Sequence, residues 1–421
     1  MKECDWSSDV CSSDLKYMEK ILVLNSGSTT VKFQLFEMEQ GFHRVLAKGM
    51  VDRIGLPGSK IVVRADNGYE FSCECPVTDH KDAIKAILDY LSHRFLKNAA
   101  ELSAVGHRMG HGGEYFDRSV IIDDDVMAKI YDTLPLLPLH GPAFVHGVEA
   151  MTELLPGVLQ VATFDSAFHQ SVEKPAFTYA IPREYYEKER IRRYGFHGTS
   201  HNYAAQKAAE LFGRAGLFIC CHLGGGASVT AIKDGKSVDT TMGYTPSAGI
   251  MMATRAGDMD PYIPLHIMKT QGKTADEVNA MFNKQSGLYG LSCGHSDMRD
   301  IIENAAKGDE NCAFAIDAFV YSLLKTIGSY VAVLGGVDAL IFTAGIGENA
   351  SLVREKLCAR LAYLGIELDG EKNRARPAPA EISAPQSKVK VYVIPANEEL
   401  MIASETFALL DELAETEPLA V

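Results

Sequence analysis

The sequence predicts an α/β protein of two lobes built on one plan, with the ligand site in the cleft between them. Three observations support this prediction. The chain has 421 residues, more than one ordinary domain uses. Short β-prone runs come first and then alternate with helical periods, which is typical of sheets covered by helices. Lastly, residues 21–37 and residues 217–235 share one order of apolar strand, small-residue turn and second strand.

Composition narrows the class of protein. A chain with 47% hydrophobic and 23% charged residues can bury large cores, which excludes disorder, coiled coil and collagen. No run approaches the roughly 20 apolar residues of a membrane helix, so we expect no membrane partner. The net charge of −14 argues against nucleic acid as a bulk partner and leaves room for a local cationic pocket. The nine scattered cysteines fit reduced thiols and a cytoplasmic location.

Residues 1–17 stand apart from the rest of the chain. They contain a Ser-Ser-Asp near-repeat, the only tryptophan and two of the nine cysteines, without a helical or strand period. A signal peptide needs a basic start and an apolar stretch, and this segment has neither. We expect a disordered, non-native leader ahead of Met18; a disordered native tail is the alternative.

The first lobe opens with strands and continues with helices. Strands are expected at residues 21–24, 31–36, 44–48, 61–64, 69–73, 105–107 and 158–164. Asp79 is placed to cap a helix whose apolar stripe comprises Ala83, Ile84, Ile87, Leu88 and Leu91. Further helices are expected at residues 123–132 and 143–155.

The second lobe repeats the pattern. A buried strand at residues 217–222 leads through three glycines into a hairpin of residues 228–232 and 237–239. A later strand, 339–342, precedes a helix at 351–361. We assign residues 18–167 with 400–421 to the N-terminal lobe and residues 168–399 to the second, nucleotide-binding lobe.

Two turns are suited to phosphate. The turn after Asn25, and the later turn Gly224, Gly225 and Gly226, lack bulky side chains, so backbone N–H groups can converge on an anion. Lys32 follows the first turn and would neutralise phosphate charge. Plain hairpins are the alternative, and neither turn has the spacing of a P-loop.

Cations and carboxylates follow other strands. Arg108, flanked by glycines, and Arg255, in a loop of small and acidic residues, can contact a carboxylate or phosphate through two N–H groups. For Arg255, an ion pair with Asp258 or Asp260 is the alternative. Asp165 comes directly after an apolar strand, where α/β sheets hold ligands, although it could also cap a helix.

Three further motifs have the chemistry of a phosphate site. His197 precedes a helix start that Ser200 can cap, which would turn the histidine toward a phosphoryl group. The glycine-rich segment 345–349, just ahead of a helix, is suited to backbone contact with a nucleotide. Glu398 and Glu399 follow the last strand, and carboxylates there can bind Mg²⁺, although acidic helix starts are also common.

The order of these motifs, from about Glu19 to the C-terminus, resembles the acetate kinase family. The motifs are Asn25-x-Gly-Ser-x-x-x-Lys, Gly-His-Arg108-x-x-His-Gly-Gly, Pro-Leu-His140, Phe-Asp165-x-Ala-Phe-His-Gln, Tyr-Gly-Phe-His197-Gly-Thr-Ser-His, Thr-Arg255-x-Gly-Asp-x-Asp-Pro, Thr-Ala-Gly345-Ile-Gly-Glu-Asn and Ile-Pro-x-Asn-Glu398-Glu. The resemblance implies the duplicated, ribonuclease H-like fold of the actin-like ATPases, and a homodimer.

The resemblance also implies a reaction: reversible, Mg²⁺-dependent, direct in-line transfer of the γ-phosphoryl group of ATP to acetate, giving acetyl phosphate and ADP. Mn²⁺ is an alternative metal. Asn25 and Glu398 would hold the metal, and Asp165, His197 and Arg255 would be catalytic. The implied substrate-binding residues are Arg108, Gly110, Leu139, His140, Phe196 and Pro246. The implied nucleotide-binding residues are Lys32, His222, Leu223, Gly224, Gly225, Gly226, Asp297, Met298, Arg299, Gly345, Ile346, Gly347, Glu348 and Asn349.

Some positions depart from the family pattern. Gly110 stands where the family usually has valine, and we expect this change to open the acyl pocket by one or two carbons, worth about 1–3 kcal/mol of discrimination per methylene. Gly141 and Gly225 replace asparagines, and Thr30 replaces a serine. A propionate or butyrate kinase is therefore the first alternative. A non-catalytic ATP-binding module is the second, and three expected cations (Arg108, His197 and Arg255) argue against it.

Overall fold

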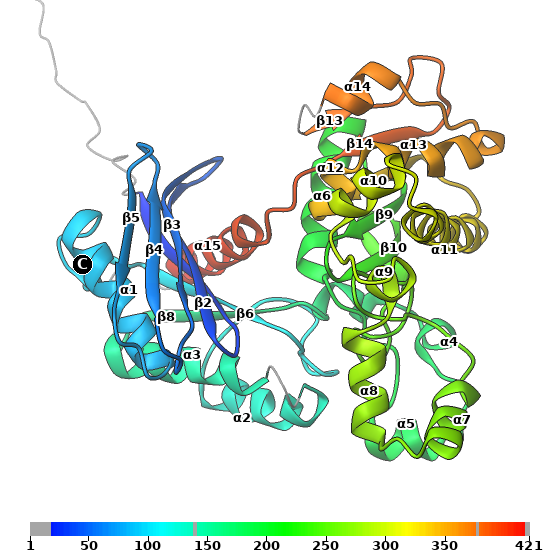
Figure 1. Cartoon of the computed structure of the whole chain (residues 1–421). Helices are drawn as coiled ribbons and strands as arrows, with labels where there is room; N and C mark the ends of the chain where they lie inside the picture. The colour runs from blue at the N-terminus through cyan, green and yellow to red at the C-terminus, as the bar shows by residue number, and fades with distance from the viewer. Residues whose placement is uncertain (1–17, 138–140, 376–378, 417–421) are drawn as a thin grey trace, which may run out of the picture.

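The computed structural model describes residues 18–137, 141–375 and 379–416, which form two lobes with one sheet each (Figure 1). The first sheet has the strand order β5-β4-β3-β2-β1-β6-β8-β7, and the second has the order β11-β10-β9-β12-β14-β13. The strands are β1 (Glu19–Ser26), β2 (Thr30–Glu39), β3 (Phe42–Asp52), β4 (Lys60–Ala65), β5 (Glu70–Glu74), β6 (Ala104–Met109), β7 (Val120–Ile121), β8 (Leu159–Phe164), β9 (Leu217–Leu223), β10 (Ala227–Lys233), β11 (Lys236–Thr240), β12 (Ala339–Thr343), β13 (Ala380–Glu381) and β14 (Lys390–Val393).

Helices cover both sheets. The α-helices are α1 (His80–Arg94), α2 (Asp124–Thr133), α3 (Gly141–Leu154), α4 (Lys174–Phe177), α5 (Glu184–Glu189), α6 (Gly198–Phe212), α7 (Tyr262–Gln271), α8 (Ala275–Lys284), α9 (Gly287–Leu291), α10 (Met298–Ala306), α11 (Glu310–Leu334), α12 (Ala344–Asn349), α13 (Ser351–Arg360), α14 (Gly370–Ala375) and α15 (Glu398–Thr416). Short 3₁₀ turns lie at Ala99–Glu101, Leu134–Leu136, Ala167–Ser171 and Ala362–Leu364.

The two sheets share one topology. In the first, β1 pairs antiparallel with β2 and parallel with β6, which pairs parallel with β8. In the second, β9 pairs antiparallel with β10 and parallel with β12, which pairs parallel with β14. The series β3-β2-β1-β6-β8 therefore corresponds to β11-β10-β9-β12-β14. This confirms the α/β fold class and the internal repeat predicted from the two strand–turn–strand segments.

Each sheet is packed on both faces, because alternate residues of a strand point to opposite sides. In β9, Ile219 and Cys221 join the core that contains α11, while Phe218 and Cys220 pack with α6. In the first lobe, α1 and α3 cover one face of the sheet and α15 covers the other. The described cysteines are all free, and Cys220 and Cys221 are buried.

Helix α11 corrects one prediction made from composition. Among the described residues, it is the one helix whose length and apolar composition would suffice to cross a membrane. Its buried residues, including Phe319, Leu323 and Ile327, are fully enclosed in the core of the second lobe. Polar residues such as Asp317 and Lys325 interrupt the sequence of this helix, so a count of consecutive apolar positions misses it, and its exposed side also carries Phe314, Tyr321 and Val333.

Most predicted elements form, with two local differences. Asp79 caps α1 as predicted, accepting a hydrogen bond from the Asp82 backbone N–H. Ser200 does not cap α6: the helix begins at Gly198 with His197 as its N-cap residue, so Ser200 lies inside the first turn. The segment expected as a loop ahead of a helix forms α12 itself, because Ala344 adopts a left-handed φ of 65° that turns the chain out of β12.

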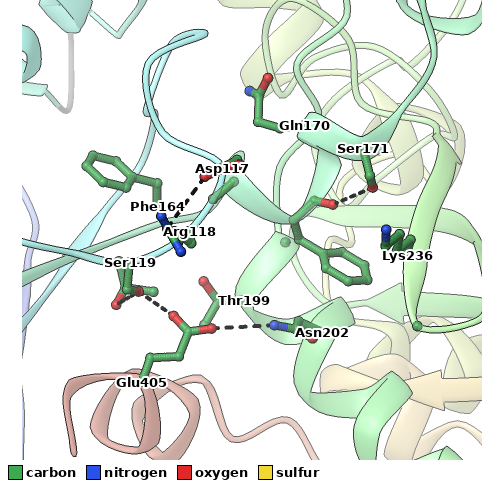
Figure 2. Close-up of a pocket in the computed structure, with 15 residues that line it drawn as sticks. Asp117, Arg118, Ser119, Phe164, Gln170, Ser171, Thr199, Asn202, Lys236 and Glu405 are labelled. Carbon is green, nitrogen blue, oxygen red and sulfur yellow. Dashed lines mark hydrogen bonds and ion pairs between the residues drawn. The ribbon is translucent and has the colours of Figure 1, made fainter. Parts of the chain in front are cut away.

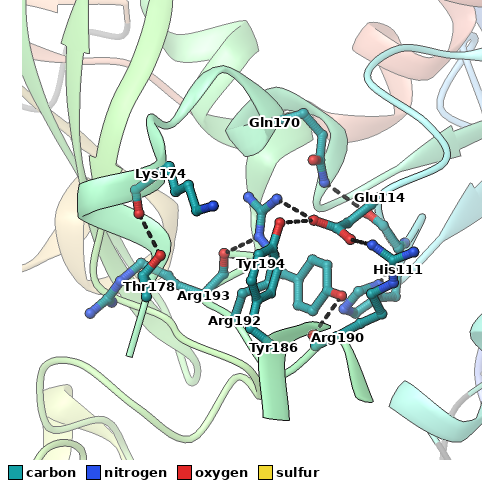
Figure 3. A network of polar contacts seen from close by, with 11 residues as sticks. His111, Glu114, Gln170, Lys174, Thr178, Tyr186, Arg190, Arg192, Arg193 and Tyr194 are labelled. Carbon is teal, nitrogen blue, oxygen red and sulfur yellow. Dashed lines mark hydrogen bonds and ion pairs between the residues drawn. The ribbon is translucent and has the colours of Figure 1, made fainter. Parts of the chain in front are cut away.

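The lobes contact each other at two polar clusters. Glu114 of the first lobe accepts hydrogen bonds from Arg192 and Arg190, each at 2.8 Å, and from Tyr186 (Figure 3). Elsewhere, Glu405 of α15 accepts hydrogen bonds from Ser119 and, at 3.4 Å, from Asn202 of the second lobe (Figure 2). These contacts hold the strand ends of the two sheets toward one another.

Candidate active site

Three neighbouring strands of the first sheet bring Asn25, Arg108 and Asp165 together at their carboxyl ends. The Arg108 guanidinium lies between the other two side chains. It donates to the Asp165 carboxylate at 2.6 and 3.3 Å and to the Asn25 amide oxygen at 3.4 Å. Asp165 is the main cause that raises the pKa of Arg108. The sequence-predicted cation and carboxylate therefore form one buried pair rather than two separate groups.

Glu398, at the start of α15, reaches the same guanidinium from the second sheet's side. Its carboxylate lies 3.9 Å from Arg108 Nε. Burial raises the pKa of Glu398 to about 7; Arg108 opposes this rise, while the neighbouring Asp165 and Glu399 carboxylates add to it. The positive charge of Arg108 therefore does not fully offset the negative charges of the Glu398, Asp165 and Glu399 carboxylates.

The oxygen atoms around Arg108 fit a divalent cation. Asn25 offers an amide oxygen and Glu398 a carboxylate, the hard donors that Mg²⁺ and Mn²⁺ prefer. Burial is the largest cause of the raised pKa of Glu398 and outweighs the opposing effects of Arg108 and Lys32, so a metal ion would stabilise the ionised form. The donor set thus suits the metal that the resemblance implies.

His197 is held beside Asp165 by a close contact of the backbone. Gly198 N–H donates to the Asp165 carbonyl at 2.8 Å, and a Cβ at Gly198 would lie only 2.3 Å from that oxygen. Thr199 Oγ1 donates to the Asp165 carboxylate at 3.3 Å. His197 itself has a left-handed φ of 58°, a strained conformation that persists only where its surroundings impose it.

The structure makes His197 a neutral group, which corrects its prediction as a cation. Burial lowers its pKa well below the usual value, and the nearby imidazoles of His222 and His201 lower it further. Its ring stacks on His222 with centroids 4.1 Å apart. A neutral imidazole still donates one N–H hydrogen bond, so His197 can contact a phosphoryl oxygen without carrying charge.

Arg255 is free of carboxylate partners within the described part of the chain. Its Nη1 donates to the Pro246 carbonyl at 3.1 Å. Asp258 and Asp260, the alternative partners weighed from the sequence, instead accept backbone N–H groups. Burial lowers the pKa of Arg255, so this is a desolvated cation available to an anionic ligand.

A cavity of about 280 Å³ joins these groups to an apolar wall from both lobes. It is lined by Asn25, Ser26, Gly27, Arg108, Gly110, Leu137, Phe144, Asp165, Phe196, His197, Pro246 and Arg255. Leu139 and His140, predicted to bind substrate, lie outside the described residues. Leu137 and Phe144 were not among the predicted site residues, because in the sequence they read as ordinary core residues of a turn and a helix.

Leu137 and Phe144 overturn the expectation that Gly110 enlarges this cavity. A Cβ at Gly110 would lie 2.8 Å from Leu137 Cδ1 and 2.8 Å from Phe144 Cε2. The volume that a side chain at position 110 would occupy is therefore already filled by these two side chains. The apolar end of the cavity is closed from α3 and the preceding turn instead of from β6.

A second cavity, of about 420 Å³, lies within the second lobe. It is lined by Gly224, Gly225, Ala253, Ser296, Asp297, Met298, Arg299, Ile302, Gly345, Ile346, Asn349 and Ala350. Eight predicted nucleotide-binding residues are in this set: Gly224, Gly225, Asp297, Met298, Arg299, Gly345, Ile346 and Asn349.

The other predicted nucleotide-binding residues lie outside this lining. Lys32 is the cross-strand neighbour of Asn25 in the first lobe. Glu348 accepts the Ala396 N–H at 2.9 Å, and the Gly347 carbonyl accepts from Arg354 at 2.7 Å, so both take part in structural contacts. Leu223 is buried in the core and His222 stacks on His197.

Gly226 lies between the two cavities, next to the two glycines that line the second one. A Cβ there would lie 3.4 Å from both His197 Nε2 and Arg255 Nη1. The glycine turn of the second lobe therefore runs directly past the imidazole and the guanidinium of the first cavity. A group bound along the turn would be in reach of both.

The profile of the acetokinase family matches residues 20–404. This chain belongs to the acetokinase family. Acetate kinases from Thermotoga petrophila and Thermotoga maritima are each 49% identical to it, and each alignment covers 94% of this chain and 99% of the relative. The resemblance noted in the motifs is thus confirmed over nearly the whole sequence.

Solved structures of the family share its fold. The acetate kinase of Porphyromonas gingivalis has 43% identity and a TM-score of 0.89, covering 93% of this chain and 100% of that one. A propionate kinase from Francisella tularensis has 40% identity and a TM-score of 0.87, with the same coverage. The duplicated lobes described above are therefore those of the acetokinase family.

A third cavity, of about 380 Å³, also lies between the lobes of this acetokinase but contains none of the predicted site residues (Figure 2). Glu405, Ser119 and Asn202 line it, and Thr199 joins it to the site through its hydrogen bond to Asp165. Its polar residues are mainly bonded to one another, and it marks the contact between α15 and α6 rather than the reacting groups.

Proposed function

We propose that this chain catalyses the acetate kinase reaction, the reversible transfer of the γ-phosphoryl group of ATP to acetate. The observation that carries the proposal is that the glycine turn of the second cavity continues into Gly226, which lies beside Arg255 and His197 of the first cavity. One cavity suits a small carboxylate with an apolar end, and the other suits a nucleotide. The family membership, and the names of the relatives, support the same reaction.

The residues divide the work of binding between the cavities. The methyl group of acetate would lie against Leu137, Phe144, Phe196 and Pro246, with its carboxylate toward the arginines. The nucleotide would lie between the segments 297–299 and 345–349, with its phosphates along the glycine turn. The acceptor oxygen would then approach the γ-phosphorus from the side opposite the leaving oxygen of ADP, as in-line transfer requires.

The transfer itself needs charge neutralisation more than proton removal, because a carboxylate is already a nucleophile. Arg255 supplies a desolvated positive charge, and His197 supplies one N–H donor. Asp165 is held by Arg108 and Thr199, so we propose that it orients the guanidinium that binds substrate. Groups held in place before the reaction lower the barrier without the cost of reorganising.

We propose Mg²⁺, with Mn²⁺ as an alternative, as the metal held by Asn25 and Glu398. When bound, the ion would neutralise part of the charge on the nucleotide's phosphates. Glu398 must be ionised to bind it, and its pKa of about 7 means that the metal would displace a proton from part of the population near neutral pH.

Acetate is the proposed acyl substrate in preference to propionate. The expected opening at Gly110 was the reason to favour a longer chain, and Leu137 with Phe144 fill that space. The Francisella relative named as a propionate kinase keeps propionate as the alternative.

The test is the formation of acyl phosphate, trapped with hydroxylamine, from ATP and each of acetate, propionate and butyrate. We expect kcat/KM to be largest with acetate and to fall with each added carbon. Propionate turnover equal to or above that of acetate would assign the alternative. If no acyl phosphate formed with any of the three acids, in a protein that still binds ATP, the result would favour the non-catalytic nucleotide-binding module.

We also propose a cytoplasmic homodimer. The free thiols of the described cysteines support a reducing compartment, and the resemblance to the family supports the dimer. Light scattering on the purified protein tests the dimer, since a mass near 45.9 kDa would indicate a monomer. Fractionation of the native cells tests the location.

A further inference from the structure

One buried hydroxyl lies between the site histidine and a second histidine that contacts neither cavity. Ser228 Oγ, on β10, is 2.9 Å from His197 Nδ1 and 2.8 Å from His201 Nε2. Ser228 and His201 are fully buried. His201 lies on α6 one turn beyond His197, so the three side chains form a short chain of hydrogen bonds leading to the site.

A serine hydroxyl has one proton, which restricts how these bonds can be arranged. It can donate to His197 and accept from His201, donate to His201 and accept from His197, or accept from both. The other ring nitrogen of His201, Nδ1, has no hydrogen-bond partner among the described residues. The arrangements therefore differ in what they leave buried without a partner.

Only the first arrangement leaves no fully buried donor unpaired, because the His197 Nε2–H that it requires faces the first cavity. If the hydroxyl donated to His201, that ring would carry its proton on Nδ1, as a buried N–H without an acceptor. If both histidines donated, the hydroxyl proton would have no acceptor. A buried unpaired donor is rarer in proteins than an unpaired acceptor and costs roughly 1–3 kcal/mol. Among the fully buried atoms, the first arrangement leaves only the Nδ1 lone pair of His201 unpaired.

We propose that His201 and Ser228 are positioning residues that fix the tautomer of His197. His201 Nε2–H donates to Ser228 Oγ, whose proton is donated to His197 Nδ1. His197 must then carry its own proton on Nε2, the atom that faces Gly226 and Arg255. The proposal deepens the proposed function, on which it rests: His197 offers the transferring phosphoryl group a donor and not a lone pair.

The tautomer of His197 decides whether its electrostatic interaction with the phosphoryl oxygens is attractive or repulsive. A lone pair on Nε2 would face the oxygens of a phosphoryl group and repel them, whereas N–H stabilises the charge that spreads over them. Burial keeps His197 neutral, so a second ring proton cannot correct a wrong tautomer. The relay therefore decides whether this side chain assists or opposes transfer.

The experiment compares variants of the full-length enzyme. Ser228→Ala and His201→Leu break the relay and should lower kcat by about 10- to 100-fold, the usual range for residues that orient a functional group, with KM for ATP and acetate little changed. His201→Gln keeps an N–H donor at the same distance along the side chain and should retain most of kcat. Equal losses in His201→Gln and His201→Leu would overturn the proposal.

Ser237→Ala is the matched control. Ser237 is also a buried β-strand serine, and its hydroxyl lies 2.9 Å from His169 Nδ1, a histidine that lines neither of the two site cavities. Ser237→Ala should lower the free energy of unfolding as Ser228→Ala does, but it should leave kcat unchanged. A similar fall of kcat in both variants would show a purely structural effect and overturn the proposal.

A direct readout separates the tautomer from the activity. In protein labelled with ¹⁵N-histidine, His197 Nδ1 should have the chemical shift of an unprotonated nitrogen and Nε2 that of a protonated one, and Ser228→Ala should reduce this difference. The opposite assignment in the parent protein would overturn the relay. If the parent made no acyl phosphate, the proposed function would fail, yet the nitrogen shifts would still decide the tautomer.

Discussion

The two lobes share one strand topology but differ in the chemical groups at the ends of their equivalent strands. The equivalent strands β8 and β14 are each followed by a carboxylate of the site, Asp165 and Glu398. The equivalent strands β6 and β12 differ: β6 carries Arg108 near its end, and β12 leads into Gly345 and α12. At the ends of these equivalent strands, the first lobe therefore presents charged side chains, whereas the second presents backbone groups of a glycine-containing segment.

The equivalent hairpin turns show the same difference. Strand β1 ends, just before its turn into β2, with Asn25 and Ser26, which line the first cavity. The turn between β9 and β10 consists of Gly224, Gly225 and Gly226, and lies between the two cavities. A repeated fold therefore fixes where strands end, while the side chains at those ends decide whether a lobe binds a small charged ligand or a nucleotide.

The largest expected difference in kcat is between two substitutions of arginine, one in the site and one on the surface. Arg255 is a desolvated cation without a carboxylate partner in the described chain, so Arg255→Ala should lower kcat by about 10³-fold, the lower range for an arginine that stabilises phosphoryl transfer. Arg183→Ala is the control, because Arg183 is exposed, is already paired with Glu187 and lines none of the three cavities. Acyl phosphate formation and thermal unfolding should both be measured. Near-parental turnover in Arg255→Ala would remove this residue from the site.

Two adjacent carboxylates at the start of α15 give the next contrast. Glu398→Gln should raise the Mg²⁺ concentration needed for half-maximal activity by about 10- to 100-fold, because a charged oxygen donor is lost. Glu399→Gln, one residue along α15, should change it little. A metal titration of initial rates checks both variants. Identical Mg²⁺ dependence in Glu398→Gln and the parent would contradict the proposed metal role.

The acyl wall belongs to the first lobe and to Phe196 and Pro246 of the second. Phe144→Ala should raise the ratio of propionate to acetate kcat/KM by about 10-fold, since room for one methylene is worth roughly 1–3 kcal/mol. Val145→Ala, on the same helix but at a buried position that does not line the cavity, should lower stability and leave the ratio unchanged. Competition assays with both acids decide, and an unchanged ratio in Phe144→Ala would mean that another residue sets chain length.

Gly110→Val tests the same apolar wall by adding a side chain, whereas Phe144→Ala removes one. The new side chain would collide with Leu137 and Phe144, so it should lower the free energy of unfolding by about 1–3 kcal/mol. Urea unfolding measures this loss. A stable variant with sharper acetate preference would instead support an open pocket at position 110.

Acid should weaken the second lobe more than the first. Burial lowers the pKa of His169, His197, His201 and His222 in the second lobe, and of His107 and His111 in the first. Below about pH 6.5 the unfolded chain binds protons that these folded histidines do not, so stability present above that pH is lost as pH falls toward about 4. At about one unit below 6.5, each such histidine removes roughly 1.4 kcal/mol.

Pulse proteolysis in urea, at about pH 7.5 and about pH 5.5, measures this contrast because fragments report each lobe separately. We expect fragments of the second lobe to appear at lower urea on acidification, with a smaller change in the first lobe. Equal shifts in both lobes would contradict the assignment of the buried histidine cluster as the acid-sensitive region.

Much of the site could be predicted from local sequence. The strand–turn–strand repeat and the polar residues at strand ends are local patterns, and Asn25, Arg108, Asp165, His197 and Arg255 meet in one cavity as those patterns imply. Errors arose where the outcome depended on distant contacts. His197 is neutral because other segments bury it, and the space at Gly110 is filled by α3, some thirty residues along the chain.

The sequence by itself determined the order of strands and turns, the duplicated plan and which polar and charged side chains are available to the site. These are encoded by the periodicity of neighbouring residues, by glycine turns and by charge. Only the tertiary structure decided which charges are paired, which groups are neutral and how long the acyl pocket is. Those properties depend on desolvation and on volume shared between segments far apart in the chain, as Ser228 shows by joining β10 to two histidines of α6.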